Sequence, residues 1–151
     1  MIASILLAAA PAIAPPQTYA WRQTLDAIRQ IETGGEPNKG RGAKGDGGKA
    51  IGPFQVWAIY HTDAAQRDKT LDDYTRCLRS VAYSERVVRA YMDRYARSAL
   101  RRLEAGAGTL VDVERIARIH NGGPRGYQKK ATLKYWAKVR SSITHTTRRS
   151  P

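Results

Sequence analysis

Residues 113–124 read Val113-Glu114-Arg115-Ile116-Ala117-Arg118-Ile119-His120-Asn121-Gly122-Gly123-Pro124. Val113, Ile116, Ala117 and His120 recur at helical intervals, so they share one face of an expected helix. The Asn-Gly pair, a second glycine and a proline end that helix. The polar His120 and Asn121 therefore lie where the apolar face stops, and we expect them to point toward an interior cleft.

The rest of the chain predicts more helices around one core. Apolar residues at helical spacing favour helices over residues 24–32, 71–81, 84–104 and 132–143, with a short helix within 54–65. Ser84 is a candidate cap for the longest of these helices. Residues 36–52 hold six glycines and almost no apolar residue before Ala50, which favours a loop or a small twisted β-hairpin. The fold class is therefore α+β and mostly helical, with five or six helices and one glycine-rich hairpin or loop.

Length and composition limit the alternatives. The 151 residues suffice for one domain with one core, and the single cysteine, Cys77, excludes an intramolecular disulfide within them. Lys and Arg outnumber Asp and Glu by 26 to 13, a net charge of +13 that favours polyanionic partners such as acidic cell-wall polymers. The basic residues are scattered and match no groove-reading motif, so we expect no specific nucleic-acid partner.

The beginning of the chain is typical of an export signal. Residues 2–14 are apolar and rich in alanine, and a small-x-small string ends at Ala20. An apolar run of this length is too short to span a bilayer. We expect a signal peptide over residues 1–20, a catalytic domain over 21–143 and a basic tail over 144–151, in a secreted or periplasmic protein.

Glu32 is the first candidate for chemistry. It lies four residues after Ile28 and seven after Leu25, on the apolar side of its expected helix. Partial burial disfavours a charged carboxylate, so this position suits a carboxylic acid that donates a proton to a leaving glycosidic oxygen.

Asp46 is the second candidate. Its glycine neighbours let water and backbone amides reach the carboxylate, which favours the ionised form. One protonated and one ionised carboxyl group form the pair that glycoside hydrolysis uses. Glu36 and Asp63 compete for this second role.

Other polar and aromatic residues suit a sugar-binding cleft. His120 and Asn121 are plausible hydrogen-bonding groups for a sugar, and no second His or Cys cluster supports a metal site. Tyr60, Trp57, Tyr91 and Trp136 are candidates either for stacking on sugar rings or for core packing. We expect no cofactor.

With these motifs in view, the chain resembles the invertebrate-type lysozymes, also called the destabilase family. The resemblance runs from Leu25 to Val139. It is most specific in the His-Asn-Gly-Gly-Pro segment at 120–124 and the Thr-Leu-x-Tyr-Trp segment at 132–136. The Ile-Glu-Thr-Gly segment at 31–34 and the Gly-Pro-Phe-Gln segment at 52–55 are shared more loosely among lysozyme-like proteins.

The resemblance implies a lysozyme-like fold that hydrolyses the β-1,4 bond between N-acetylmuramic acid and N-acetylglucosamine in peptidoglycan. Glu32 would be the proton donor and Asp46 the second carboxylate. The implied substrate-binding positions are Tyr60, Asp63, Tyr91, His120, Asn121 and Gly122. A retaining mechanism would need the two carboxyl groups about 5–5.5 Å apart.

The chain departs from the family in its cysteines. Animal members are rich in disulfides, whereas Tyr127 stands here where they carry cysteine. We therefore expect a bacterial or phage relative without disulfides, and the loop between Glu32 and Asp46 is the part least comparable with the family. The isopeptidase activity of some members has no identifiable residues here.

Two alternatives remain open at this stage. A lytic transglycosylase would need only Glu32 and would release 1,6-anhydro products. A non-catalytic cell-wall-binding protein could keep the fold without the chemistry, although the presence of both carboxylates argues against it. The oligomeric state is not predicted.

Overall fold

The computed structural model describes residues 16–34 and 38–147. Their seven α-helices are α1 (Trp21–Thr33), α2 (Ala58–Ala65), α3 (Arg76–Arg79), α4 (Val81–Tyr95), α5 (Arg97–Glu104), α6 (Leu110–Gly122) and α7 (Leu133–Thr147). The strands are β1 (Lys44–Gly45), β2 (Ala50–Ile51) and β3 (Val56–Trp57). Four 3-10 turns complete the order: η1 (Asn38–Gly40), η2 (Asp46–Gly48), η3 (Gly126–Gln128) and η4 (Lys130–Thr132). The predicted class, α+β and mostly helical, is confirmed, with more helices than the five or six expected.

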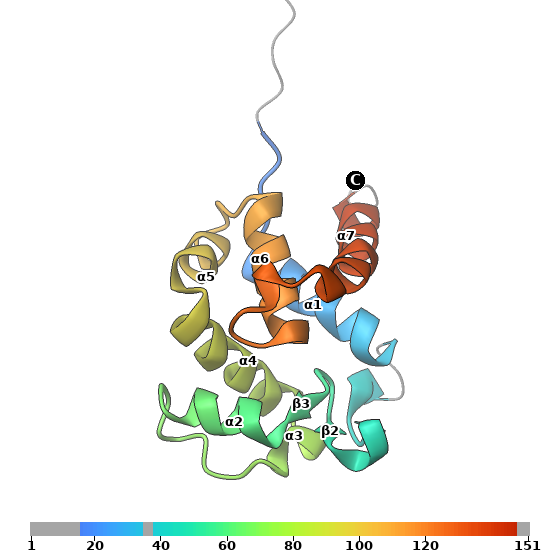
Figure 1. Cartoon of the computed structure of the whole chain (residues 1–151), viewed down its shortest axis with the longest axis vertical. Helices are drawn as coiled ribbons and strands as arrows, with labels where there is room; N and C mark the ends of the chain where they lie inside the picture. Colours follow the sequence, from blue (N-terminus) through green and yellow to red (C-terminus); the bar gives the residue numbers. More distant parts are fainter. Residues whose placement is uncertain (1–15, 35–37, 148–151) are drawn as a thin grey trace, which may run out of the picture.

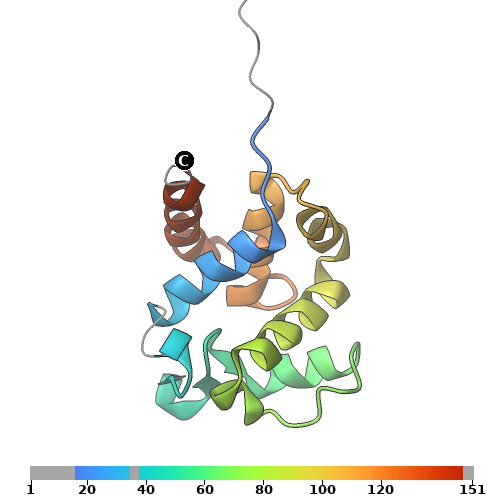
Figure 2. The same cartoon turned by 180° about the vertical axis from the view of Figure 1, so that it is seen from behind.

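Helix α6 lies at the centre of the molecule. It packs against α1, α4, α5 and α7, and its residues Val113, Ile116 and Ala117 are fully buried. Figures 1 and 2 show α1, α5, α6 and α7 in the upper half and the sheet, α2 and α3 in the lower half, with α4 passing between the halves. The expected helix over 113–120 is confirmed, and it ends at Gly122 with Gly123 as its cap.

The expected single helix over 84–104 is two helices. Ala96 leaves the helical conformation (φ −145°, ψ 35°), so α4 ends at Tyr95 and α5 begins at Arg97. Leu100 and Leu103 are still buried beyond the break, which keeps the apolar spacing in phase and hides the break from the sequence pattern. The cap is Ser80, whose hydroxyl accepts from the Tyr83 N–H, and not Ser84.

Residues 71–81 form less helix than their spacing predicts. Within this range, α3 is four residues long, and the next helix, α4, does not begin until Val81. The Asp73 carboxylate accepts bonds from the backbone N–H and the hydroxyl of Thr75, which favours a turn over a continuous helix. The predicted helix within 54–65 starts at Ala58, because residues 56–57 form β3.

The glycine-rich segment folds as a small antiparallel sheet in the order β1-β2-β3. Lys44 pairs with Ile51, and Ile51 pairs in turn with Val56. Gly52 joins β2 to the loop before β3 at φ +75°, and a Cβ there would lie 2.1 Å from the Cys77 carbonyl oxygen. A side chain at Gly52 is therefore excluded both by backbone conformation and by space.

The described chain reaches the core before α1 begins. Tyr19 is buried and pairs with Gly108 through two backbone hydrogen bonds. At the other end, α7 extends through Thr147, into the stretch expected to be a tail, while residues 148–151 and most of the expected signal peptide (1–15) lie outside the described residues. No helix within 16–34 and 38–147 is long and apolar enough to cross a membrane.

Candidate active site

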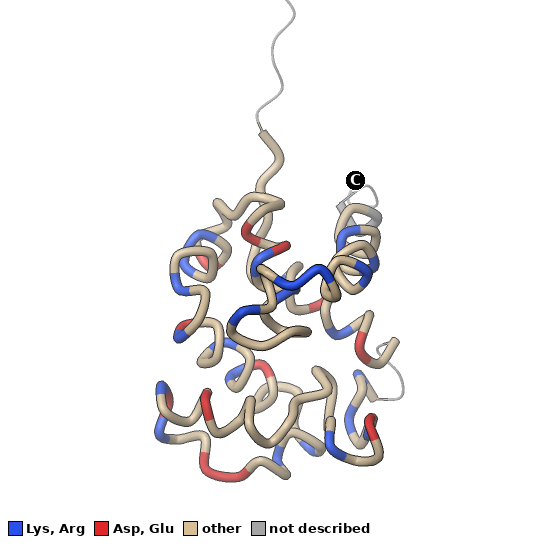
Figure 3. The backbone as a smooth tube through the Cα atoms, viewed as in Figure 1, with Lys and Arg blue, Asp and Glu red and all other residues tan. Residues whose placement is uncertain are grey.

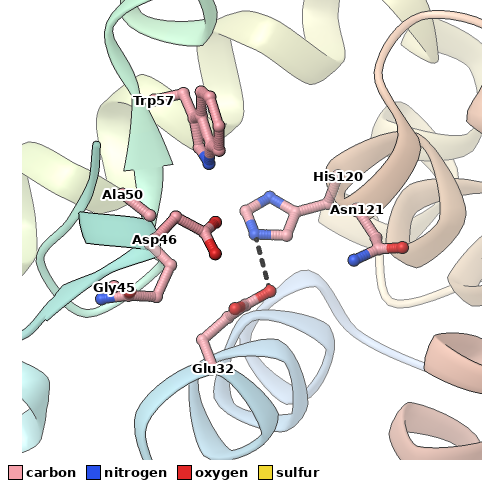
Figure 4. A pocket seen from close by; sticks show the side chains of 8 residues that line it. Glu32, Gly45, Asp46, Ala50, Trp57, His120 and Asn121 are labelled. Atoms are coloured by element: carbon pink, nitrogen blue, oxygen red, sulfur yellow. Dashed lines mark ion pairs between the residues drawn. The ribbon is translucent and has the colours of Figure 1, made fainter. Parts of the chain in front are cut away.

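A cavity of about 380 Å³ opens between the end of α1, the small sheet and the end of α6. Its walls come from three separate parts of the chain. The lining residues are Glu32, Gly45, Asp46, Ala50, Gln55, Trp57, His120 and Asn121. Figure 4 shows the carboxyl groups of Glu32 and Asp46 facing this space from different elements, with Trp57 and His120 on its other sides.

Glu32 lies in the last turn of α1, and one of its carboxyl oxygens, Oε1, has two polar neighbours. The Tyr135 hydroxyl of α7 donates to Oε1 at 2.6 Å, and His120 Nε2 of α6 lies 3.4 Å from the same oxygen. Within the described residues, nothing bonds to Oε2. The Glu32 side chain is 17% exposed, so it is largely buried while still bordering the cavity.

His120 has protein partners at both ring nitrogens. Nε2 lies 3.1 Å from the Phe54 carbonyl oxygen and faces Glu32, so two acceptors indicate that Nε2 carries the proton of the neutral ring. Nδ1 then accepts from the Tyr60 hydroxyl at 3.1 Å. Burial, with smaller effects of Tyr91 and Glu32, raises the pKa of Tyr60 well above its usual value, so this hydroxyl keeps the proton that it donates.

Asp46 lies at the start of η2 with φ +50°, an uncommon conformation for a residue other than glycine. Its side chain is exposed and borders the cavity. The expected bonds from backbone amides are not present: no N–H group in the described residues donates to its carboxylate. The surroundings of this carboxylate are therefore solvent, and not a cradle of backbone amides.

Glu32 and Asp46 differ from the other acidic residues in their charge partners. Among the acidic side chains within 16–34 and 38–147, these two alone have no arginine or lysine within 4 Å. Every other described carboxylate forms an ion pair with an arginine, and those residues are Asp26, Asp63, Asp68, Asp72, Asp73, Glu85, Asp93, Glu104, Asp112 and Glu114. Lys and Arg are spread over both halves of the molecule (Figure 3), so this absence of pairing is local to the cavity.

A second cavity of about 240 Å³ continues the first along α2 and α4. It shares Gln55, Trp57, His120 and Asn121 with the first cavity, and together they form one cleft. Its remaining lining residues are Ile59, Tyr60, Asp63, Tyr91, Gly123 and Pro124. Tyr60 and Tyr91 are buried and stack on one another, with ring centroids 3.6 Å apart, so they form its inner wall.

The structure brings most of the predicted site residues to this cleft. Asp63, considered for the second carboxylate, lies in the second cavity and is bonded by the Tyr95 hydroxyl at 2.9 Å. Glu36, the other competitor, lies outside the described residues. Gly122 lines neither cavity; its carbonyl accepts from the Lys129 ammonium, and a Cβ there would meet Thr132.

Sequence reasoning assigned no role to Tyr135. Its hydroxyl meets Glu32 across 103 residues of chain, a contact that no local spacing can predict. Burial first, and then the adjacent Glu32 carboxylate, raises the pKa of Tyr135 well above its usual value. Trp57, considered only as one of several aromatic residues, is 43% exposed and borders both cavities.

The described residues contain no group of three or more His, Cys, Asp or Glu side chains placed to hold a metal ion. What the cleft offers chemically is a carboxyl group bonded by the Tyr135 hydroxyl, a solvated carboxylate in the same cavity, and aromatic walls beside them.

The family and the fold are both matched by known proteins. The model of the family described as Destabilase matches residues 22–142. Lysozyme 1 of Crassostrea virginica is 34% identical over 80% of this chain, and the aligned part is 58% of that oyster protein, so the chain spans less than two thirds of its length. Invertebrate-type lysozyme 6 of Caenorhabditis elegans is 33% identical, with 79% of this chain and 84% of the relative covered.

A solved structure agrees with this assignment. The complex of Meretrix lusoria lysozyme with PliI of Aeromonas hydrophila matches with a TM-score of 0.60 and 27% identity, covering 85% of this chain and 93% of that one. The predicted lysozyme-like fold is thus confirmed. The family match over 22–142 and the relatives in the nematode and the bivalves show that this chain belongs to the destabilase family of invertebrate-type lysozymes.

Proposed function

We propose that the protein is a muramidase that hydrolyses the β-1,4 bond between N-acetylmuramic acid and N-acetylglucosamine in peptidoglycan. The observation that carries the proposal is the pair Glu32 and Asp46, the two described carboxyl groups without an arginine or lysine within 4 Å, on the walls of one cavity. An adjacent guanidinium favours the ionised form of a carboxyl group, which is unsuited to proton donation. Family membership supports the same reaction class.

In the proposed reaction, Glu32 is the general acid. Its carboxyl proton passes to the glycosidic oxygen as the bond between that oxygen and the anomeric carbon breaks. Asp46 is the second carboxylate, which stabilises the positive charge on the anomeric carbon or forms a bond to it. Water then attacks that carbon and returns a proton to Glu32, so the carboxyl groups end as they began.

We assign substrate-binding roles to Tyr60, Asp63, Tyr91, His120, Asn121 and Gly122, in two groups. Asp63 and Asn121 border open space and can bond directly to sugar hydroxyl and acetamido groups. Tyr60, Tyr91 and His120 are buried, so they shape and support the inner wall. Gly122 acts through the backbone that carries Asn121.

Glu32→Gln tests the assignment. Glutamine keeps an oxygen that can accept from Tyr135 but cannot donate an acidic proton, so activity on purified peptidoglycan should fall by at least about 100-fold with little change in Tm. Glu104→Gln is the control, because Glu104 pairs with Arg89 away from the cleft. Equal activity of Glu32→Gln and the unmodified protein would refute the proposal.

The products distinguish hydrolysis from the alternative of a lytic transglycosylase. Mass spectrometry of the released fragments should show reducing ends. Products with 1,6-anhydro ends would replace the proposed hydrolysis with transglycosylation, and binding of cell walls without product release would indicate a non-catalytic binding protein.

We also propose that the chain is exported, with cleavage before Tyr19 and not near Ala20. The buried Tyr19 side chain and its two backbone bonds to Gly108 support this position, because cleavage at Ala20 would remove them from the domain. The intact mass of the secreted protein tests it. A mature chain that begins at Trp21 would contradict it.

We propose a bacterial or phage source and an attraction to anionic cell-wall polymers. The single cysteine supports the first, because one cysteine cannot form the intramolecular disulfides in which the animal members are rich. The net charge of +13 supports the second. Binding to intact cell walls should weaken as salt rises, and binding that is independent of salt would contradict the electrostatic part.

A further inference from the structure

Glu32 has two oxygens in unequal surroundings. Oε1 is engaged by the Tyr135 hydroxyl at 2.6 Å and lies 3.4 Å from His120 Nε2. Oε2 has no bond within the described residues. Because the Tyr135 hydroxyl already donates to Oε1, a proton added to the carboxyl group is more stable on Oε2.

We propose that Tyr135 is a positioning residue for Glu32: its hydroxyl bond to Oε1 directs the transferable proton to Oε2. The inference rests on the proposed function, since it concerns the general acid of that reaction. It adds a residue from α7 to a site otherwise built from α1, the small sheet and α6.

The surroundings of Tyr135 suit this role. Its hydroxyl keeps its proton, because burial raises the pKa of Tyr135 well above the usual value. Within the described residues, the carboxyl group of Glu32 is its one hydrogen-bond partner. Helix α7 packs directly against α1, so the two residues are held by a helix-to-helix contact and not by a loop.

Loss of the Tyr135 hydroxyl is also expected to change the pH profile of activity. A donor bonded to a carboxyl oxygen stabilises the ionised form more than the neutral form. The other titratable groups near Glu32 are His120 of α6, Tyr60 of α2 behind it, and Asp46 of η2 in the same cavity. Removal of the Tyr135 hydroxyl leaves all three in place, so its effect on the pH profile can be separated from theirs.

Tyr135→Phe is the test. We expect kcat to fall by roughly 10-fold with KM nearly unchanged, and the alkaline limb of the pH–activity profile to move up by roughly 0.5 pH unit. Tyr83→Phe is the matched control, because it removes a buried hydroxyl bonded to His61 and to the Asp73 N–H, outside the cleft. The Tyr83→Phe control should leave kcat and both limbs of the pH–activity profile unchanged.

A change in Tm without a shift of the alkaline limb would show that Tyr135 is merely structural and would overturn the inference. If Tyr135→Phe does not fold, 3-fluorotyrosine at position 135 keeps the ring and makes the hydroxyl a stronger donor. The alkaline limb of the pH–activity profile should then move to lower pH, and an unmoved limb would overturn the inference. Failure of the proposed function would look different, because Glu32→Gln would then retain full activity.

Discussion

The buried Asp112 side chain is expected to stabilise the helix that carries His120 and Asn121. It accepts two bonds from Arg102, at 2.6 and 3.0 Å, and two from the N–H and hydroxyl of Thr109 at the start of α6. Asp112→Ala removes all four. Loss of the Asp112 half of the capping box at the start of α6 costs about 1 kcal/mol.

The ion pair between Arg102 and Asp112 contributes less to stability than a fully buried pair would, because the Arg102 side chain is 51% exposed and can be solvated by water when its partner is removed. With about 1–2 kcal/mol for the remaining charged bonds of Asp112, the total loss is roughly 2–3 kcal/mol, or about 5–10 °C in Tm for a domain of this size. Thermal unfolding followed by circular dichroism measures it. Asp72→Ala is the control, because that carboxylate is 69% exposed and forms an i,i+4 pair with Arg76.

The same pair predicts a pH dependence. Bonding by Arg102 lowers the pKa of Asp112 below its ordinary value of 3.8. A lowered pKa in the folded state stabilises the fold above pH 3.8, and this contribution is lost as the pH falls through the lowered pKa. The difference in Tm between the unmodified protein and Asp112→Ala should therefore narrow below about pH 3.8. Equal Tm losses for Asp112→Ala and Asp72→Ala, or a difference that does not change with pH, would refute this reasoning.

Three further predictions follow from the same structure. Gly52→Ala should lower the free energy of unfolding in urea by roughly 2–4 kcal/mol, because its Cβ would meet the Cys77 carbonyl. Gly47 has φ +65° but open space around it, so Gly47→Ala should lower that free energy by only about 1 kcal/mol. Equal losses for the two variants would contradict the packing argument. Trp57→Ala should raise KM for peptidoglycan by roughly 10-fold with little change in Tm, because Trp57 is 43% exposed on the cleft; an unchanged KM would exclude contact with the glycan. Burial lowers the pKa of His61 below 6.5. The neutral His61 side chain therefore contributes to the stability of the fold above pH 6.5, and this contribution is lost as the pH falls through the lowered pKa. Tm measured from pH 8 to 4 should show a decrease that the His61→Gln variant lacks.

The sequence predicted the elements whose signals are local. The apolar spacing around Ile116 and the stop at Asn121-Gly122 identified α6, and the glycines of 36–52 identified the small sheet. The break at Ala96 was missed, because burial resumes on the same face and no Gly or Pro marks the change.

The candidate site was predictable in part, because two of its residues carry local signals in the sequence. Glu32 and Asp46 stand out by type and position, and the structure brings both to one cavity. The bond from Tyr135 and the pairing of the ten other described carboxylates with arginines depend on contacts between distant segments, which spacing along the chain does not reveal.

A structure of Glu32→Gln with a bound peptidoglycan oligosaccharide would test the central claim most directly. We predict a glycosidic oxygen within hydrogen-bond reach of the residue 32 side chain, about 2.6–3.2 Å, with the adjacent anomeric carbon facing Asp46. An oligosaccharide bound elsewhere, or one whose glycosidic oxygens lie far from both side chains, would contradict the account.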